Sequence, residues 1–155
     1  MTDPIVIAQP VQADAARQDY SPWLEAVLKV ARHYRLDVSP ESVRLASIHS
    51  EGRVEEVVRH MARQAGLSVK FADYDHKSLS RWRTPLVVQL QDGQVGVIES
   101  VSETGELGIA YSGDQGLQSR IEPSALADQA VRTVILRPIQ PLSDVRTNDY
   151  IKPYD

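Results

Sequence analysis

Two residues on one predicted helix have a spacing that metal sites use. Glu56 and His60 lie four positions apart, which places both side chains on the same face of a helix. A carboxylate and an imidazole can bind zinc, but a closed site needs further ligands, and such a pair is far commoner on the solvated face of a helix. The sequence therefore predicts no metal ion, and it predicts no other cofactor.

Nucleophilic catalysis has little support in the residues. The chain contains no cysteine, which excludes a thiolate nucleophile, a cysteine-based zinc site and a disulfide scaffold. Its four histidines and many serines allow a serine triad in principle, but the Gly-x-Ser-x-Gly turn is absent. A glycine-rich phosphate loop and an aromatic-basic stripe are also missing, so nucleotides and nucleic acids are not expected as ligands. Binding of some other partner is favoured over catalysis.

Three side chains are candidates for contacts with a partner. Trp23 is expected to face the core and cover the sheet. His33 is expected to be a partly buried, hydrogen-bonded residue at the edge of the core, with substrate contact as the alternative. Trp82 stands between Arg81 and Arg83 in a predicted polar loop. An exposed indole between two arginines suits the capture of an unfolded chain, and packing is an equal alternative.

The composition fits one domain. The chain has 155 residues, of which 42% are hydrophobic, and this length buries roughly two thirds of the unfolded surface. The net charge of −4 gives no general attraction to nucleic acid or to anionic lipid. No window reaches the ~18 uninterrupted apolar residues of a membrane span, and the first ten residues lack the features of a signal peptide. We therefore expect a soluble domain, cytosolic by default.

The elements that must position these residues fall into two blocks. Helical spacing predicts helices near residues 21–34, 39–46 and 54–65; the first two open with Ser-Pro, in which the serine caps the helix, and the third stops at Gly66. Strand-type runs follow at 67–71, 85–90, 95–100, 106–111, 117–121 and 131–137, with a hairpin signal at Asp92-Gly93 and a short helix from 122. Helices followed by strands predict an α+β fold, an antiparallel sheet with helices on one side.

Both ends of the chain are predicted to lie outside this domain. Residues 1–20 are rich in alanine and glutamine and are expected to form a flexible leader. Residues 139–155 contain Pro141 and Pro153 among charged and aromatic residues, with no period that fits a core element. We interpret this tail as a linker to another part of a larger protein, and the domain as residues 21–138.

The pattern of the first helix, together with this order of elements, resembles the C39 peptidase family at the N-terminus of peptide- and protein-exporting ABC transporters. In that family the first helix reads approximately Asp-Cys-Gly, then six or so small and apolar residues, then an aromatic pair and a glycine. The resemblance covers about residues 20–138 and implies a papain-like fold. The matching stretches are Ser21-Pro22-Trp23 through Arg32-His33-Tyr34-Arg35, Val38-Ser39-Pro40-Glu41, Ala65-Gly66-Leu67, Pro85-Leu86-Val87-Val88 and Gly93 to Ile98.

Carried over one residue at a time, the resemblance implies a site without its catalytic groups. The nucleophilic cysteine of the family corresponds to Pro22, its histidine to Val95 or Gln94, and its aspartate to a position near Tyr111. Proline, valine and tyrosine cannot do the work of a thiolate, its base and an orienting carboxylate, so no peptidase activity is expected. In haemolysin-type relatives a histidine and a tryptophan partner remain, whereas here Val95 and Gln89 stand at those places.

The chain therefore looks like the peptidase-dead, C39-like domain of a type I secretion transporter, of the kind that exports RTX toxins and large biofilm adhesins; residues 142–154 also look like the linker before the first membrane span of adhesin exporters. The implied partners are an unfolded secreted protein and the membrane and nucleotide-binding domains of the same transporter, at the cytoplasmic face of the bacterial inner membrane. Two alternatives stay open, a purely structural domain and a hydrolase with another residue set. The substrate-binding candidates are Trp23, His33, Trp82, Gln89 and Tyr111.

Overall fold

Three helices open the fold in the computed structural model, which describes residues 19–49 and 52–139. They are α2 (Ser21–His33), α3 (Pro40–His49) and α4 (Val54–Gln64), close to the predicted ranges. In α2 the buried side chains recur at helical spacing, since Trp23, Ala26, Val27, Val30 and Ala31 all face the core. The periodicity of the sequence therefore located these helices correctly.

The helix ends confirm two predicted signals and correct a third. The Ser39 hydroxyl accepts a hydrogen bond from the Ser42 N–H at 3.3 Å, as a capping serine does. Gly66 follows α4 with a φ of +82°, the left-handed conformation that ends many helices. Ser21, in contrast, is the first residue of α2 and not its cap. Tyr20 is the N-cap and makes no side-chain cap bond, while the Asp19 carboxylate accepts the Ser21 N–H at 2.9 Å. This hydrogen bond lowers the pKa of Asp19.

A six-stranded antiparallel sheet forms the second half of the fold. Its order is β1-β6-β2-β3-β4-β5, so the last strand of the described chain lies between the first two, and every predicted strand is present. Two single turns of 3-10 helix, η1 (Arg81–Arg83) and η2 (Gln91–Gly93), flank β2, and η2 forms the predicted turn at Asp92-Gly93. The strands are β1 (Leu67–Ala72), β2 (Leu86–Leu90), β3 (Val95–Val101), β4 (Leu107–Tyr111), β5 (Gln118–Ile121) and β6 (Ala130–Pro138).

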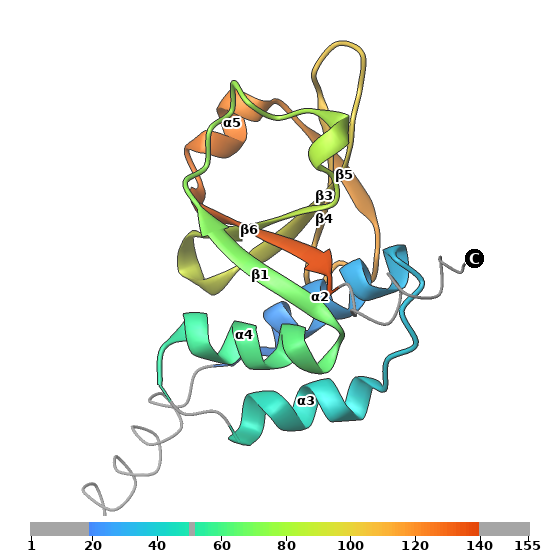
Figure 1. Cartoon of the computed structure of the whole chain (residues 1–155). Coiled ribbons are helices and arrows are strands. Elements are labelled where there is room, and N and C mark those ends of the chain that lie inside the picture. Colours follow the sequence, from blue (N-terminus) through green and yellow to red (C-terminus); the bar gives the residue numbers. More distant parts are fainter. Residues whose placement is uncertain (1–18, 50–51, 140–155) are drawn as a thin grey trace, which may run out of the picture.

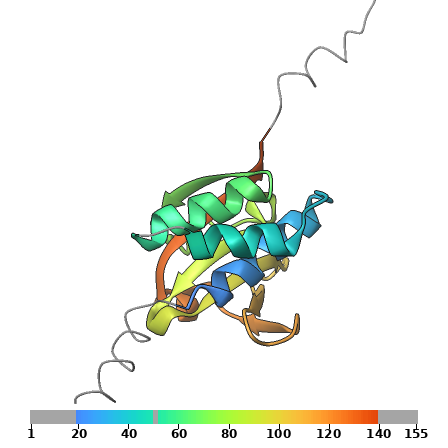
Figure 2. The same ribbon diagram turned by 90° about the horizontal axis from the view of Figure 1, so that it is seen from below.

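Helices cover both faces of this sheet unequally. α2 and α4 pack directly on one face, and α3 packs on them further from the strands (Figures 1 and 2). The opposite face carries the short helix α5 (Pro123–Ala127), whose Leu126 is buried in a second apolar cluster. The predicted α+β class is confirmed, with α5 as the exception to helices on one side.

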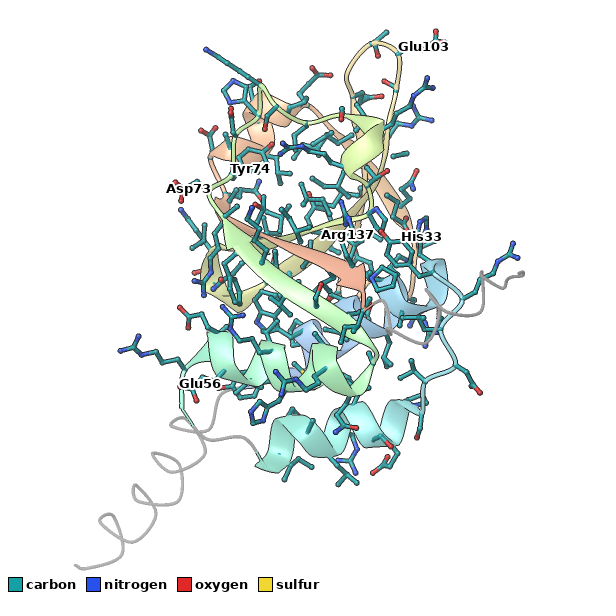
Figure 3. All side chains as sticks on the ribbon, in the orientation of Figure 1. His33, Glu56, Asp73, Tyr74, Glu103 and Arg137 are labelled. Atoms are coloured by element: carbon teal, nitrogen blue, oxygen red, sulfur yellow. The ribbon has the colours of Figure 1, made fainter. Side chains whose placement is uncertain are left out.

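One hydrogen bond ties the covering of this second face together. The Tyr74 hydroxyl donates to the Pro123 carbonyl at 2.7 Å, linking the segment after β1 to α5. Tyr74 lies on the side of the sheet away from the three large helices (Figure 3). The sheet is thus enclosed between a helical layer and a thinner layer of loop and short helix.

The two ends predicted to flank the domain lie outside the described residues, apart from Asp19, Tyr20 and Ile139. Within residues 19–49 and 52–139, no helix combines the length and the apolar character needed to cross a lipid bilayer.

Candidate functional site

The first turn of α2, the start of β3 and the end of β4 meet at one place. Ser112, which directly follows β4, joins the other two: its hydroxyl donates to the Pro22 carbonyl at 2.7 Å, and its N–H donates to the Val95 carbonyl at 2.9 Å. The positions that the sequence comparison assigned to a cysteine and a histidine are therefore close neighbours in space. The fold brings the first turn of α2 and the start of β3 together through Ser112.

The side chains at this place are not arranged for nucleophilic attack. Val95 is 1% exposed and belongs to the core under the helices, and Gln89 faces it across the β2–β3 ladder. The Ser112 hydroxyl donates its hydrogen bond to the Pro22 carbonyl oxygen. A carbonyl cannot take the proton that a serine nucleophile must lose, so Ser112 is placed to hold α2.

Tyr111 lies on the other face of the sheet. It pairs with Gly96 and packs, beside Ile109, against the apolar cluster that α5 covers. Burial, helped by the negative charge of Asp114, raises the pKa of the Tyr111 phenol. Because neighbouring strand residues alternate between faces, the residue that reaches Pro22 is Ser112. The sequence analysis missed Ser112, and only the phase of β4 could have indicated it.

Further polar contacts fasten α2 along the strands. The Gly113 N–H donates to both carboxylate oxygens of Glu25 at 3.1 Å, one turn after the start of the helix. Lys29 forms an ion pair with Glu99 of β3 at 3.1 Å, and the Gln118 amide of β5 donates to the same carboxylate at 3.0 Å. These contacts join α2 to β3 and to the turn after β4, and Glu99 links β5 to the same ion pair.

Gln89 is held by an arginine. Arg132 of β6 donates to its side-chain oxygen at 2.7 Å and to the Glu55 carboxylate of α4 at 3.0 Å. The pKa of Glu55 is lowered, first by its own backbone N–H and then by Arg132. The same guanidinium lies over the Phe71 ring at 4.8 Å, and that of Arg59 lies over it at 5.1 Å. Gln89 is thus part of a network that locks α4 onto β1 and β6.

The remaining predicted contact residues are Trp23, His33 and Trp82. Trp23 is 4% exposed, which confirms the prediction that it faces the core. His33 is the last residue of α2 and is exposed, with its ring edge-on to Tyr34 at 4.9 Å (Figure 3), so the expected partial burial is wrong. The buried stripe of α2 ends at Ala31 and leaves His33 outside it. Trp82 lies in η1, across the sheet from α2 (Figure 1).

A groove of about 510 Å³ runs between α3 and α4 on the outer side of the helical layer. Leu45 of α3, which lines the groove, is 40% exposed, and Ile48 of the same helix is 56% exposed. His60 of the predicted Glu56–His60 pair lines the groove. Within the described residues, no group of three or more His, Asp or Glu side chains could hold a metal ion. The lining is Ser42, Leu45, Ala46, His60, Arg63 and Gln64.

Known structures share this architecture, although no protein-family model and no curated protein matches the chain. The crystal structure of the N-terminal peptidase C39-like domain of the toxin secretion ATP-binding protein from Vibrio parahaemolyticus matches with a TM-score of 0.64. The match has 19% identity and covers 79% of this chain and 100% of that one. The chain has the fold of a C39 peptidase-like domain.

Two peptidases share this C39-like fold with the chain. A double-glycine-motif protease from an AMS/PCAT transporter, in complex with the leader peptide, matches with a TM-score of 0.62 and 17% identity over 79% of this chain and 87% of that one. The peptidase domain of Streptococcus ComA, a bifunctional ABC transporter involved in a quorum-sensing pathway, matches with a TM-score of 0.59 and 21% identity over 79% and 95% of the two chains. At such low identity the fold is what the proteins share.

Proposed function

We propose that this chain is a non-catalytic recruiting domain of a type I secretion ABC exporter, which binds an unfolded RTX-type protein or adhesin before translocation. The domain, residues 21–138, lies at the cytoplasmic face of the bacterial inner membrane, and residues 139–155 link it to the first membrane span. Its other partners are the membrane and nucleotide-binding domains of the same transporter, which carry any ATP hydrolysis.

The observation that supports this proposal is the state of the papain-like site. Pro22, Val95 and Ser112 lie where α2, β3 and the end of β4 meet, and their contacts are hydrogen bonds to backbone carbonyls and core packing. A peptidase there needs a nucleophile, a proton acceptor and an orienting group, and the chain has no cysteine. The chain has the fold of exporter peptidases but lacks their cysteine nucleophile, and this combination supports a role in binding.

The test uses the 155-residue chain and the secreted protein of its own exporter. The substrate is added once unfolded and once folded, and both cleavage and binding are measured, by mass spectrometry and by NMR chemical shifts. We expect no cleavage, binding of the unfolded form alone, and shifts on one contiguous surface, since an unfolded segment docks through many weak contacts.

Each alternative predicts a different result. Specific cleavage of the substrate would show a hydrolase that uses other residues and would refute the proposal. Binding to the purified membrane and nucleotide-binding domains, with no response to unfolded substrate, would indicate a purely structural role.

A further inference from the structure

β1 is an edge strand with an open hydrogen-bonding side. Its one neighbour in the sheet is β6, and within residues 19–49 and 52–139 no other backbone group donates to it or accepts from it. The Ile139 N–H donates to the Gly66 carbonyl at 2.9 Å, which fixes the phase of the ladder. Because bonded pairs alternate in an antiparallel ladder, Ser68, Lys70 and Ala72 bond to β6.

The intervening residues therefore direct their backbone groups away from the sheet. The N–H and C=O groups of Val69 and Phe71 point to the open side, and Pro138, which has no N–H, stands opposite Leu67 where the ladder needs no donor. An extended chain could bond to these groups without disturbing β6. Strand addition of this kind uses main-chain hydrogen bonds and tolerates many sequences.

The side chains along this edge are apolar and cationic. Val69 and Phe71 are half-buried on the helical face, and the exposed Arg59 of α4 lies over the Phe71 ring at 5.1 Å. Lys70 is exposed on the opposite face, since strand residues alternate. Neither Arg59 nor Lys70 takes part in an ion pair among the described residues. A positive charge therefore flanks the open edge on each face.

We propose that the open edge of β1 docks an extended acidic segment of the unfolded substrate by strand addition. The inference rests on the recruiting function proposed above and names the surface and the chemistry of the segment. Carboxylates of the added strand would meet Arg59 on one face and Lys70 on the other. A second copy of β1 is a poorer occupant, because it would bring cations against these cations.

The probe is a synthetic peptide of about ten residues in which pairs of Thr or Val alternate with pairs of Asp, so that carboxylates lie on both faces of the added strand. It is long enough to span the six residues of β1. Amide hydrogen exchange of the 155-residue chain is followed by NMR with and without the peptide. We expect new protection of the Val69 and Phe71 amides and little change at Ser68 and Lys70, whose N–H groups already bond to β6. Peptides with Lys in place of Asp, or N-methylated at alternate residues, are expected to give no protection.

Charge reversal provides the matched variants. Lys70→Glu and Arg59→Glu each change an exposed side chain and are expected to weaken binding of the acidic peptide about tenfold at low salt, with the loss shrinking as salt rises. Val69→Pro removes an outward N–H and is expected to abolish binding, with circular dichroism as the check of its fold. Leu45→Asp in the groove between α3 and α4 is the control and is expected to bind normally.

The outcomes separate this inference from the recruiting function. Protection in the groove between α3 and α4 or around Pro22, or normal binding by folded Val69→Pro and Lys70→Glu variants, overturns docking at β1 and leaves recruitment standing. Binding of the natural unfolded substrate with no effect of the acidic peptide does the same. If neither ligand changes any amide of the folded chain, recruitment and docking both fail.

Discussion

Ser112 shows how a single residue can join a helix to two strands. Its side chain donates to Pro22 in the first turn of α2, while its N–H donates to the start of β3. Neither contact depends on a charge or on a proton acceptor. The side-chain hydrogen bond links two elements, and its contribution should be measurable as stability.

Replacing Ser112 by alanine should lower the free energy of unfolding by about 1 kcal/mol, because the Pro22 carbonyl loses its side-chain donor in a partly buried place. Urea denaturation measures the change. Ser119→Ala on the exposed strand β5 is the control, since Ser119 makes no side-chain hydrogen bond among the described residues, and it should change the stability by less than about 0.5 kcal/mol. Equal effects of the two variants would contradict the role of Ser112.

Tyr74 gives the fold a dependence on alkaline pH. Burial raises its pKa to about 12, and its hydroxyl donates to the Pro123 carbonyl. The unfolded phenol titrates near 10, so the unfolded state loses its proton first. The contribution of Tyr74 is therefore complete below about pH 10 and is lost as pH rises toward about 12.

The phenylalanine variant of Tyr74 should remove this contribution. Tyr74→Phe loses the hydrogen bond to Pro123 and should be less stable at neutral pH by about 1 kcal/mol. Its stability should then fall less steeply between about pH 10 and 12 than that of the unchanged chain. Denaturant titrations at a series of pH values measure both effects, and parallel curves for the two proteins would exclude Tyr74 as the titrating group.

At the scale of elements, local sequence patterns predicted which helices and strands are present but not how they are arranged in space. Helical and strand periods located the elements because burial on one side imposes those periods. The order of the sheet, with β6 between β1 and β2, comes from long-range pairing that no local pattern records. α2 begins at Ser21 itself and not one residue later. The face of the sheet on which Tyr111 lies depends on a strand phase that the sequence alone does not show.

Gly96 of β3 lies so close to Ile109 that adding one methyl group there should destabilise the protein. A Cβ on Gly96 would lie 2.8 Å from Cδ1 and 3.1 Å from Cγ1 of Ile109, which is fully buried. Gly96→Ala should therefore cost about 1–3 kcal/mol through overpacking. Ile109→Val removes Cδ1, so the double variant should be more stable than the sum of the single effects predicts. Additive effects in urea denaturation would contradict the contact.

For the molecule as a whole, one sheet separates two apolar clusters. The larger cluster contains α2, α3, α4 and one face of the sheet, and the smaller one contains the other face and Leu126 of α5. Alternating residues of the same strands serve both clusters, as Val87 and Val88 of β2 do. Sequence patterns could predict that each strand is apolar, but not which layer covers each face, because that depends on the topology of the sheet.

Because the two apolar clusters share the same strands, we expect both to unfold together. Met61→Ala in the helical cluster and Leu126→Ala in α5 both truncate side chains that are 0% exposed, and each should cost about 2–5 kcal/mol. Each variant should shift a single transition, with Trp fluorescence and far-ultraviolet circular dichroism coinciding, because neither cluster keeps its strands without the other. If Leu126→Ala instead produced a separate early transition while α2 stayed folded, the face under α5 would be an independent unit, and an extended chain docked on β1 would stabilise only the helical side.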